Sequence, residues 1–125
     1  RHLSEWPPAT SEQALYLQPF GHLGDYPPEI NTRPANFRYD PADPTPTTGG
    51  PLLSTKAGYR DDTELAQRDD VLSFTGDTLT EDLFVYGSPV LELAHSSDNP
   101  HVDLFVRVSE VDEKGRSHNV SDGYR

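Results

Sequence analysis

A serine between a glycine and a proline is the first place to look for covalent chemistry in this chain. Gly87-Ser88-Pro89 comes nearest to the Gly-x-Ser-x-Gly nucleophile elbow, in which a strained strand-to-helix turn projects the serine hydroxyl. Here a proline follows the serine and removes the backbone N–H that an oxyanion hole would use. We therefore predict a tight turn between strands at this point and assign no catalytic residue to the chain.

Histidine and carboxylate side chains offer a second kind of chemistry. The five histidines are scattered, at positions 2, 22, 95, 101 and 118. His95 and His101 lie near Asp98 and Asp103, and imidazole together with carboxylate suits a borderline or hard metal ion. The intervening residues 96–100 are typical of a connection between strands, so we predict no metal site and no cofactor. Adjacent acidic pairs point to opposite faces of an extended chain, which disfavours paired-carboxylate glycosidase chemistry.

Aromatic side chains on a β-sheet can stack on a sugar ring, which makes a carbohydrate-binding module the alternative function. The candidates are Trp6, Tyr16, Tyr26, Tyr59 and Tyr86. Packing in a core or an interface accounts for the same residues, and the sequence does not place them on one surface. Asn119-Val120-Ser121 fits the glycosylation sequon, a short pattern that often occurs by chance.

Composition and charge narrow the classes of function further. The chain has 125 residues, of which 33% are hydrophobic, and a net charge of −11. So acidic a chain repels phosphate, and we predict neither nucleic acid nor an anionic membrane as a partner. Cysteine is absent, which excludes disulfides and thiolate zinc sites. Methionine is absent as well, and the sequence begins at Arg1, so we expect a piece of a longer protein.

The elements that would position any site are short β-strands. Val, Leu, Phe, Thr and Tyr fill three runs within residues 70–93, and turn residues separate the runs, as in an antiparallel sheet. The sequence predicts strands at residues 14–18, 71–75, 82–86, 90–95 and 102–111, a hairpin turn at 113–116, and a returning strand at 117–120. We predict an all-β fold in which residues 1–125 form one domain.

A long irregular segment, residues 19–60, separates the first two predicted strands. Prolines interrupt it and are densest in residues 40–51, which favours a stiff, extended path. So long a connection without secondary structure commonly marks a functional loop or an interface.

Three blocks of sequence, taken in order, resemble a known protein family. Residues 37–50, Phe-Arg-Tyr-Asp-Pro-Ala-Asp-Pro-Thr-Pro-Thr-Thr-Gly-Gly, resemble the proline-rich loop of the non-catalytic C-terminal domain of X-Pro dipeptidyl-peptidases and cocaine-esterase-like acyl hydrolases. Residues 67–74, followed by 79–87, are similar to the next block of that domain. Residues 102–111, then Gly115-Arg116 and Gly123-Tyr124-Arg125, resemble the block after it. Together the blocks span roughly residues 6–125, and their order makes the resemblance specific.

The resemblance implies a jelly-roll β-sandwich of the galactose-binding-like type. In such enzymes the sandwich packs on an α/β-hydrolase domain that holds the Ser-His-Asp triad and cleaves esters, or peptides after proline. No triad residue can be carried onto this chain. Family members continue beyond the position of Arg125 with further strands, so the resemblance implies a sandwich that is incomplete at its C-terminal end. The implied partners are the catalytic domain and the remaining strands, and exposed strand edges offer a route to a homo-oligomer.

The leading hypothesis from the sequence is therefore an accessory domain of a serine hydrolase, whose loop at residues 40–51 docks near the rim of the active site. The residues expected at the interface with the catalytic domain are Trp6, Tyr39, Asp40, Pro41, Asp43, Pro44, Pro46 and Thr47.

Overall fold

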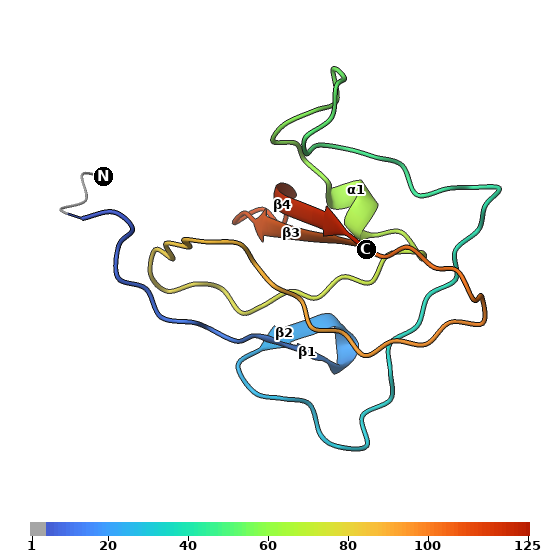
Figure 1. Cartoon of the computed structure of the whole chain (residues 1–125), viewed down its shortest axis with the longest axis horizontal. Helices are drawn as coiled ribbons and strands as arrows, with labels where there is room; N and C mark the ends of the chain where they lie inside the picture. The colour runs from blue at the N-terminus through green and yellow to red at the C-terminus, as the bar shows by residue number, and fades with distance from the viewer. Residues whose placement is uncertain (1–4) are drawn as a thin grey trace. The chain divides into compact units, whose positions relative to one another are not determined.

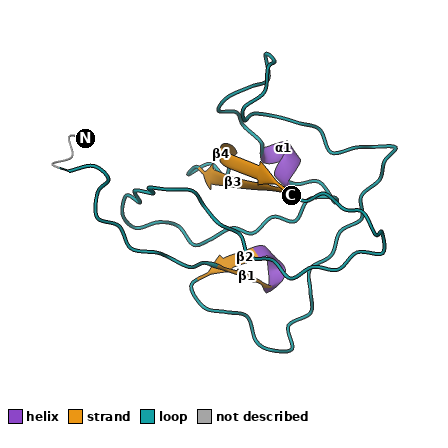
Figure 2. Cartoon of the chain, viewed as in Figure 1, coloured by secondary structure: helices purple, strands orange, loops and turns teal. Residues whose placement is uncertain are grey.

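A computed structural model describes residues 5–125, in two compact units that we treat separately. Unit 1 takes residues up to 33 together with 74–94, and unit 2 takes residues 34–73 together with 95–125. Most of the chain is loop (Figure 2). The elements, in chain order, are β1 (Tyr16–Gln18), the 3₁₀ turn η1 (Pro19–Gly21), β2 (His22–Gly24), α1 (Thr63–Ala66), β3 (Phe105–Val111) and β4 (Ser117–Tyr124).

Unit 1 is organised around a short antiparallel hairpin, β1–β2, in which Leu17 pairs with Leu23. The connecting turn carries a positive φ at Phe20 (61°) and at Gly21 (72°). Thr75 adds an isolated parallel bridge to β2, since its carbonyl accepts the Leu23 N–H at 3.0 Å. The predicted strand at residues 14–18 is thus confirmed at its last three residues. The predicted irregular segment, residues 19–60, is wrong at its start, where η1 and β2 form. The sequence does not reveal β2 because so short a strand shows no alternating pattern.

Unit 2 contains the longer hairpin, β3–β4, with α1 beside it (Figure 1). Arg107 on β3 pairs with Asp122 on β4, and the register shifts at a β-bulge between Val108 and Ser109. Its turn is closed by Asp112, whose carboxylate accepts the backbone N–H groups of Lys114 and Arg116 at 2.9 Å. The predicted strand at residues 102–111 is confirmed from Phe105 onward and is wrong for residues 102–104. The turn and the returning strand are confirmed, with β4 running on to Tyr124.

The predicted strands at residues 71–75, 82–86 and 90–95 are wrong, because the structure assigns no strand to these runs and leaves only the bridge at Thr75. β propensity is a local preference, whereas a strand also needs a second backbone alongside it. The coarse prediction holds: α1 is the single helical turn in residues 5–125 apart from η1, and the regular structure is otherwise β. The sheets are two-stranded and do not close.

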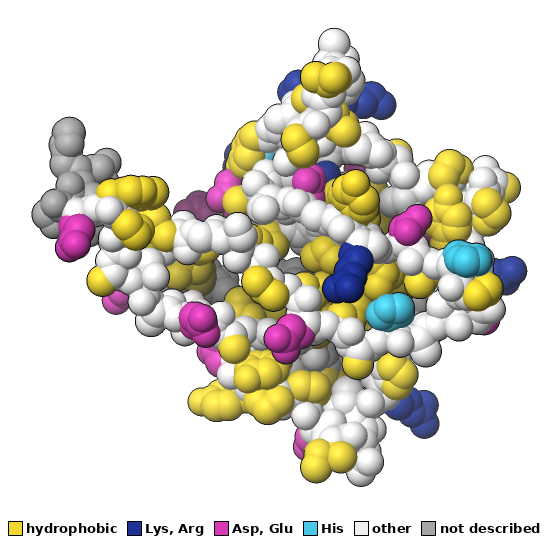
Figure 3. Space-filling model, viewed as in Figure 1, with side chains coloured by type: hydrophobic (Ala, Val, Ile, Leu, Met, Phe, Trp, Pro, Cys, Tyr) yellow, Lys and Arg dark blue, Asp and Glu magenta, His cyan; other side chains and the backbone are white. Residues whose placement is uncertain are grey.

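Hydrophobic side chains lie largely at the surface of both units. Among residues 5–125 no hydrophobic residue is buried, whereas Asp62, Ser117 and Asn119 are buried, at 4%, 9% and 6% exposure. Yellow hydrophobic groups are accordingly visible over the face in Figure 3. The largest apolar run lies in unit 1, where Val85 is 73% exposed and Val90 84%. What holds unit 2 together is therefore polar.

Exposed apolar runs of this size predict that the isolated chain binds a hydrophobic dye and self-associates. We expect anilinonaphthalene sulfonate fluorescence to rise on addition of the chain, and light scattering to increase with protein concentration. The double substitution Leu83→Ser/Val85→Ser should reduce both signals, while Asp77→Ser/Glu81→Ser, in the same run, should not. A chain that stays monomeric and leaves the dye dark would contradict the exposure described above.

Candidate functional site

The residues that the sequence places at an interface fall into both units. Seven of the eight lie in the segment at residues 39–47, here called the Pro-rich loop, which belongs to unit 2. Trp6 lies in unit 1, where its ring packs edge-on against Tyr86, with 6.1 Å between ring centroids and an angle of 72°. These two rings line an open hollow of about 340 Å³ together with Pro7, Pro8, Thr10 and Gly87.

Among the other aromatic candidates, Tyr59 has a ring contact within unit 2. Tyr59 stacks on His118 at 5.0 Å between ring centroids, and its hydroxyl donates to Glu110. That hydrogen bond to the carboxylate raises the pKa of Tyr59. The ring is therefore engaged in packing on β4, and the Trp6 and Tyr86 rings meet at an angle instead of presenting parallel faces. No observation favours the carbohydrate-binding alternative.

The Pro-rich loop begins with a tight turn whose side chains point outward. The Asp40 carboxylate accepts the Ala42 N–H at 2.9 Å, and the Asp40 carbonyl accepts the Asp43 N–H at 3.1 Å. This Asx turn fixes the backbone locally, since the aspartate side chain takes the place of a backbone acceptor. Tyr39 remains 55% exposed, and the three prolines at 41, 44 and 46 are exposed as well.

An ion-pair cluster, here called the Arg68 clamp, holds the middle of the loop. Arg68 donates to both carboxylate oxygens of Asp70, from Nε at 2.7 Å and from Nη2 at 2.9 Å. The same Nη2 reaches the Asp43 carbonyl at 2.9 Å and its carboxylate at 3.2 Å. Thr45 donates its hydroxyl to Asp70 at 2.6 Å. A bidentate guanidinium of this kind is geometrically specific, so two loop residues are tied to the segment after α1.

The electrostatics of the clamp favour its charged form. Hydrogen bonds from Arg68 first, and then from Thr45, hold the pKa of the Asp70 carboxyl at about 2. The hydrogen bond to Asp70 in turn raises the pKa of Arg68. The clamp formed by Arg68, Asp70 and Thr45 is not predicted from the sequence, because the pairing between the loop and the later segment joins residues 25 apart. The proximity of Arg68 to the acidic pair 69–70 is the one signal that the sequence offered.

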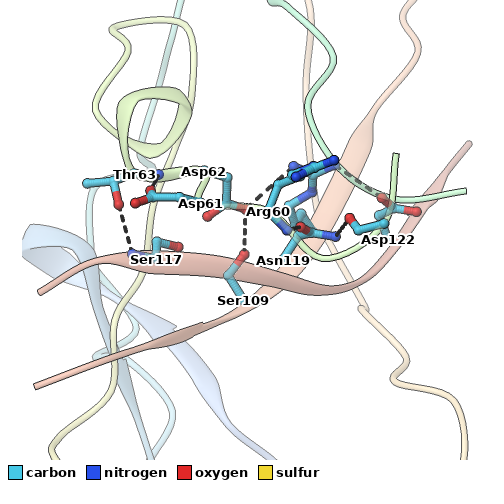
Figure 4. A network of polar contacts seen from close by, with 10 residues as sticks. Arg60, Asp61, Asp62, Thr63, Ser109, Ser117, Asn119 and Asp122 are labelled. Atoms are coloured by element: carbon cyan, nitrogen blue, oxygen red, sulfur yellow. Dashed lines mark hydrogen bonds and ion pairs between the residues drawn. The ribbon is translucent and has the colours of Figure 1, made fainter. Parts of the chain in front are cut away.

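A buried polar cluster, here called the Asp62 network, ties the start of α1 to the hairpin (Figure 4). Asp62 Oδ2 accepts the Ser109 hydroxyl at 2.9 Å and Arg107 Nη1 at 3.4 Å. Arg107 Nη2 donates to Asp122 at 3.1 Å. Backbone bonds reinforce these contacts, because the Asp62 N–H donates to the Ser117 carbonyl at 2.9 Å. One guanidinium is therefore shared by two carboxylates from separate segments.

Asn119, on β4, lies beside the Asp62 network and joins the hairpin to residues 58–60 (Figure 4). Its Oδ1 accepts the Arg60 N–H at 2.7 Å, and its Nδ2 donates to the Gly58 carbonyl at 3.1 Å. A glycan needs a free, exposed carboxamide nitrogen, whereas this one is buried and bonded. The sequon at residues 119–121 is thus closed in the folded chain.

The arrangement of these groups suits positioning better than catalysis. The hydroxyl of Ser109 donates to a carboxylate, and no histidine takes part in that contact as a general base would. Throughout residues 5–125, no three His, Asp or Glu side chains gather as metal ligands, and His95, Asp98, His101 and Asp103 are no exception. His2 lies outside the described residues. Over the same described range, no helix is long and apolar enough to cross a membrane.

Comparison with known proteins gives a family match and a similar relative. The family model for the X-Pro dipeptidyl-peptidase C-terminal non-catalytic domain matches residues 1–125. Cocaine esterase from Rhodococcus sp. (strain MB1 Bresler) is 35% identical over 89 residues, which cover 70% of this chain and 16% of that protein. The chain therefore corresponds to a small part of this much longer relative. No solved structure matches the chain significantly.

The Asp62 network predicts a large loss of stability when one carboxylate is removed. Asp62→Ala should lower the free energy of unfolding by about 3 kcal/mol, because it leaves a buried guanidinium short of a partner. Ser109→Ala should cost about 1 kcal/mol, the value of one hydrogen bond. Urea denaturation measures both changes, and Glu113→Ala, an exposed acid in the hairpin turn, is the control. An Asp62→Ala effect no larger than the control's would refute a stabilising role for the network.

The Arg68 clamp predicts a specific acid sensitivity of the Pro-rich loop. The folded pKa of Asp70, about 2, lies below the ordinary aspartate value of about 3.9. The clamp therefore contributes its full stability above about pH 4 and loses it as the pH falls toward 2. After correction for the intrinsic pH dependence of amide exchange, the amides of Asp43 and Thr45 should lose protection as the pH falls across this window.

Asp70→Asn should accelerate the exchange already at pH 7 and abolish the acid-induced change. Asp69→Asn, an exposed neighbour, serves as the control and should leave both unaltered. Identical profiles for the two variants would mean that Asp70 does not hold the loop.

Proposed function

The chain belongs to the family of X-Pro dipeptidyl-peptidase C-terminal non-catalytic domains, and we propose that it is the accessory domain of a serine hydrolase. In this proposal it packs on an α/β-hydrolase catalytic domain of the same parent protein and helps to shape or stabilise the active site. The observation that carries the proposal is the family match over all 125 residues. The similarity to cocaine esterase supports the proposal. The matched part is only 16% of that relative, so the rest of its chain is long enough to contain a catalytic domain.

The Pro-rich loop is the contact surface that we propose for the catalytic domain. Its exposed tyrosine and prolines are presented on a backbone that the Asp40 turn and the Arg68 clamp already fix. A loop that is ordered before it binds loses little conformational entropy on docking, which favours its use as an interface. Tyr39 supplies the large amphipathic side chain that interfaces favour at their centre.

The apolar runs of unit 1 support a second part of the proposal, a completed jelly-roll sandwich of the galactose-binding-like type. Residues 82–86 and 90–95 have the composition of strands, yet their apolar side chains are exposed. We propose that the remaining strands of the sandwich cover them in the parent protein. Burial there would remove about 25 cal/mol of unfavourable hydration per Å² of apolar surface, a term that this chain by itself does not gain.

Substitutions in the Pro-rich loop of the intact parent hydrolase test the proposed contact. Tyr39→Ala/Pro44→Ala/Pro46→Ala, or deletion of residues 43–50, should lower kcat/KM by about tenfold or reduce the melting temperature of the catalytic domain, through the loss of about 1.4 kcal/mol of interface energy. Glu113→Ala/Lys114→Ala, in the β3–β4 turn, is the matched surface control. Unchanged kinetics and melting temperature in the loop variants would reject the contact.

The isolated chain provides the complementary measurement. We expect it to be inert toward ester and prolyl substrates, because no nucleophile elbow lies in its sequence. Hydrolysis that co-purifies with the chain through successive columns would reject the accessory role.

A further inference from the structure

We propose that Asn119, a residue of β4 outside the Pro-rich loop, is a positioning residue for that loop. Its carboxamide forms, together with Asp122, a seat on which the turn at Gly49-Gly50 rests. The seat fixes where the chain that follows the loop lies against the hairpin. The consequence for turnover rests on the proposed function, whereas the structural role does not.

The Gly49-Gly50 turn approaches the hairpin so closely that a side chain has no room there. Both glycines have positive φ, 71° and 76°, and backbone bonds of 2.9 Å hold the Gly49 N–H to Lys56 and the Gly50 N–H to Gly58. A Cβ at Gly49 would stand 2.4 Å from Asn119 Oδ1, and one at Gly50 would stand 2.4 Å from Asp122 Oδ2. Such contacts are far inside van der Waals range, so the bare backbone must lie directly against these two side chains.

The seat cannot easily yield, because both of its side chains are fixed from behind. The Asn119 carboxamide uses its oxygen on Arg60 and its nitrogen on Gly58, and it is only 6% exposed. Asp122 is held by Arg107, which the Asp62 network anchors. Rotating either group away from the turn would break hydrogen bonds in a buried site, which costs more than in water.

The chain is thereby held at two points, one within the Pro-rich loop and one just after its end. The Arg68 clamp grips Asp43 and Thr45, and the seat receives Gly49 and Gly50. Residues 46–48 alone connect the two points, and the first of them is a proline with a fixed φ. So short a link leaves little freedom, so displacing the seat must displace the loop.

Paired glycine substitutions in the intact parent hydrolase separate close approach from backbone strain. Gly49→Ala introduces both, whereas Gly115→Ala introduces strain alone, since Gly115 has a φ of 76° and nothing within 4 Å of its Cβ position. We expect Gly49→Ala to accelerate amide exchange at residues 43–48 roughly tenfold more than Gly115→Ala does. In an Asn119→Ala background, which removes the colliding carboxamide, Gly49→Ala should add only the smaller effect of backbone strain. Should Gly49→Ala unfold the hairpin, Gly50→Ala with Asp122→Ala provides the same cycle.

The kinetic readout distinguishes this inference from the proposed function. We expect Gly49→Ala to lower kcat/KM while the catalytic domain keeps its melting temperature. Faster loop exchange with unchanged kinetics would support the positioning role and reject the docking role of the loop. Equal exchange in Gly49→Ala and Gly115→Ala, or an effect of Gly49→Ala that persists in full without the Asn119 carboxamide, would overturn the inference.

Discussion

The arrangement of unit 2 depends on one buried positive charge that two carboxylates share. The Arg107 guanidinium lies between Asp62, from the segment before α1, and Asp122, from β4. Each of these side chains is at least 87% buried, so none of the three charges is well solvated. Removing charges from water is costly, and mutual attraction with additional hydrogen bonds is what offsets it. The path of the chain around the hairpin follows from that requirement.

This constraint reverses the usual arrangement of a half-buried sheet. On one face of β3, Arg107 and Ser109 both contact the buried Asp62, whereas Val108, on the opposite face, remains 45% exposed. A sheet normally buries its apolar face and leaves the polar one to water. Buried ion pairs require a specific geometry but bury little apolar surface. They therefore determine how the segments are arranged more than they contribute to the free energy of folding.

The sequence predicts those parts of the molecule that short-range patterns control. The strand-forming residues at 102–111 and the turn residues at 113–116 predict the β3–β4 hairpin. The stiff Pro-rich loop is also visible in the sequence. Long-range polar pairing is not, because nothing in a local window shows that Arg68 reaches back to Asp43 or that Asn119 receives Arg60. The strands predicted at 82–86 and 90–95 fail for a related reason: the pattern reports strand-forming composition but not whether a neighbour is present.

The bulge in the β3–β4 hairpin decides which way two side chains of β4 point. Val108 pairs with Ser121 and Ser109 with Asn119, which leaves Val120 as an extra residue between them. Three positions separate Asn119 from Asp122, an odd spacing that would send them to opposite sides of a regular strand. Because Val120 is the extra residue of the bulge, Asn119 and Asp122 nevertheless lie on the same face of β4. Both side chains therefore approach the adjacent glycines 49 and 50. A single-residue deletion at Val120 would therefore convert the bulge into a regular ladder and keep both halves of the seat on one face, because Asn119 and Asp122 would then stand two positions apart.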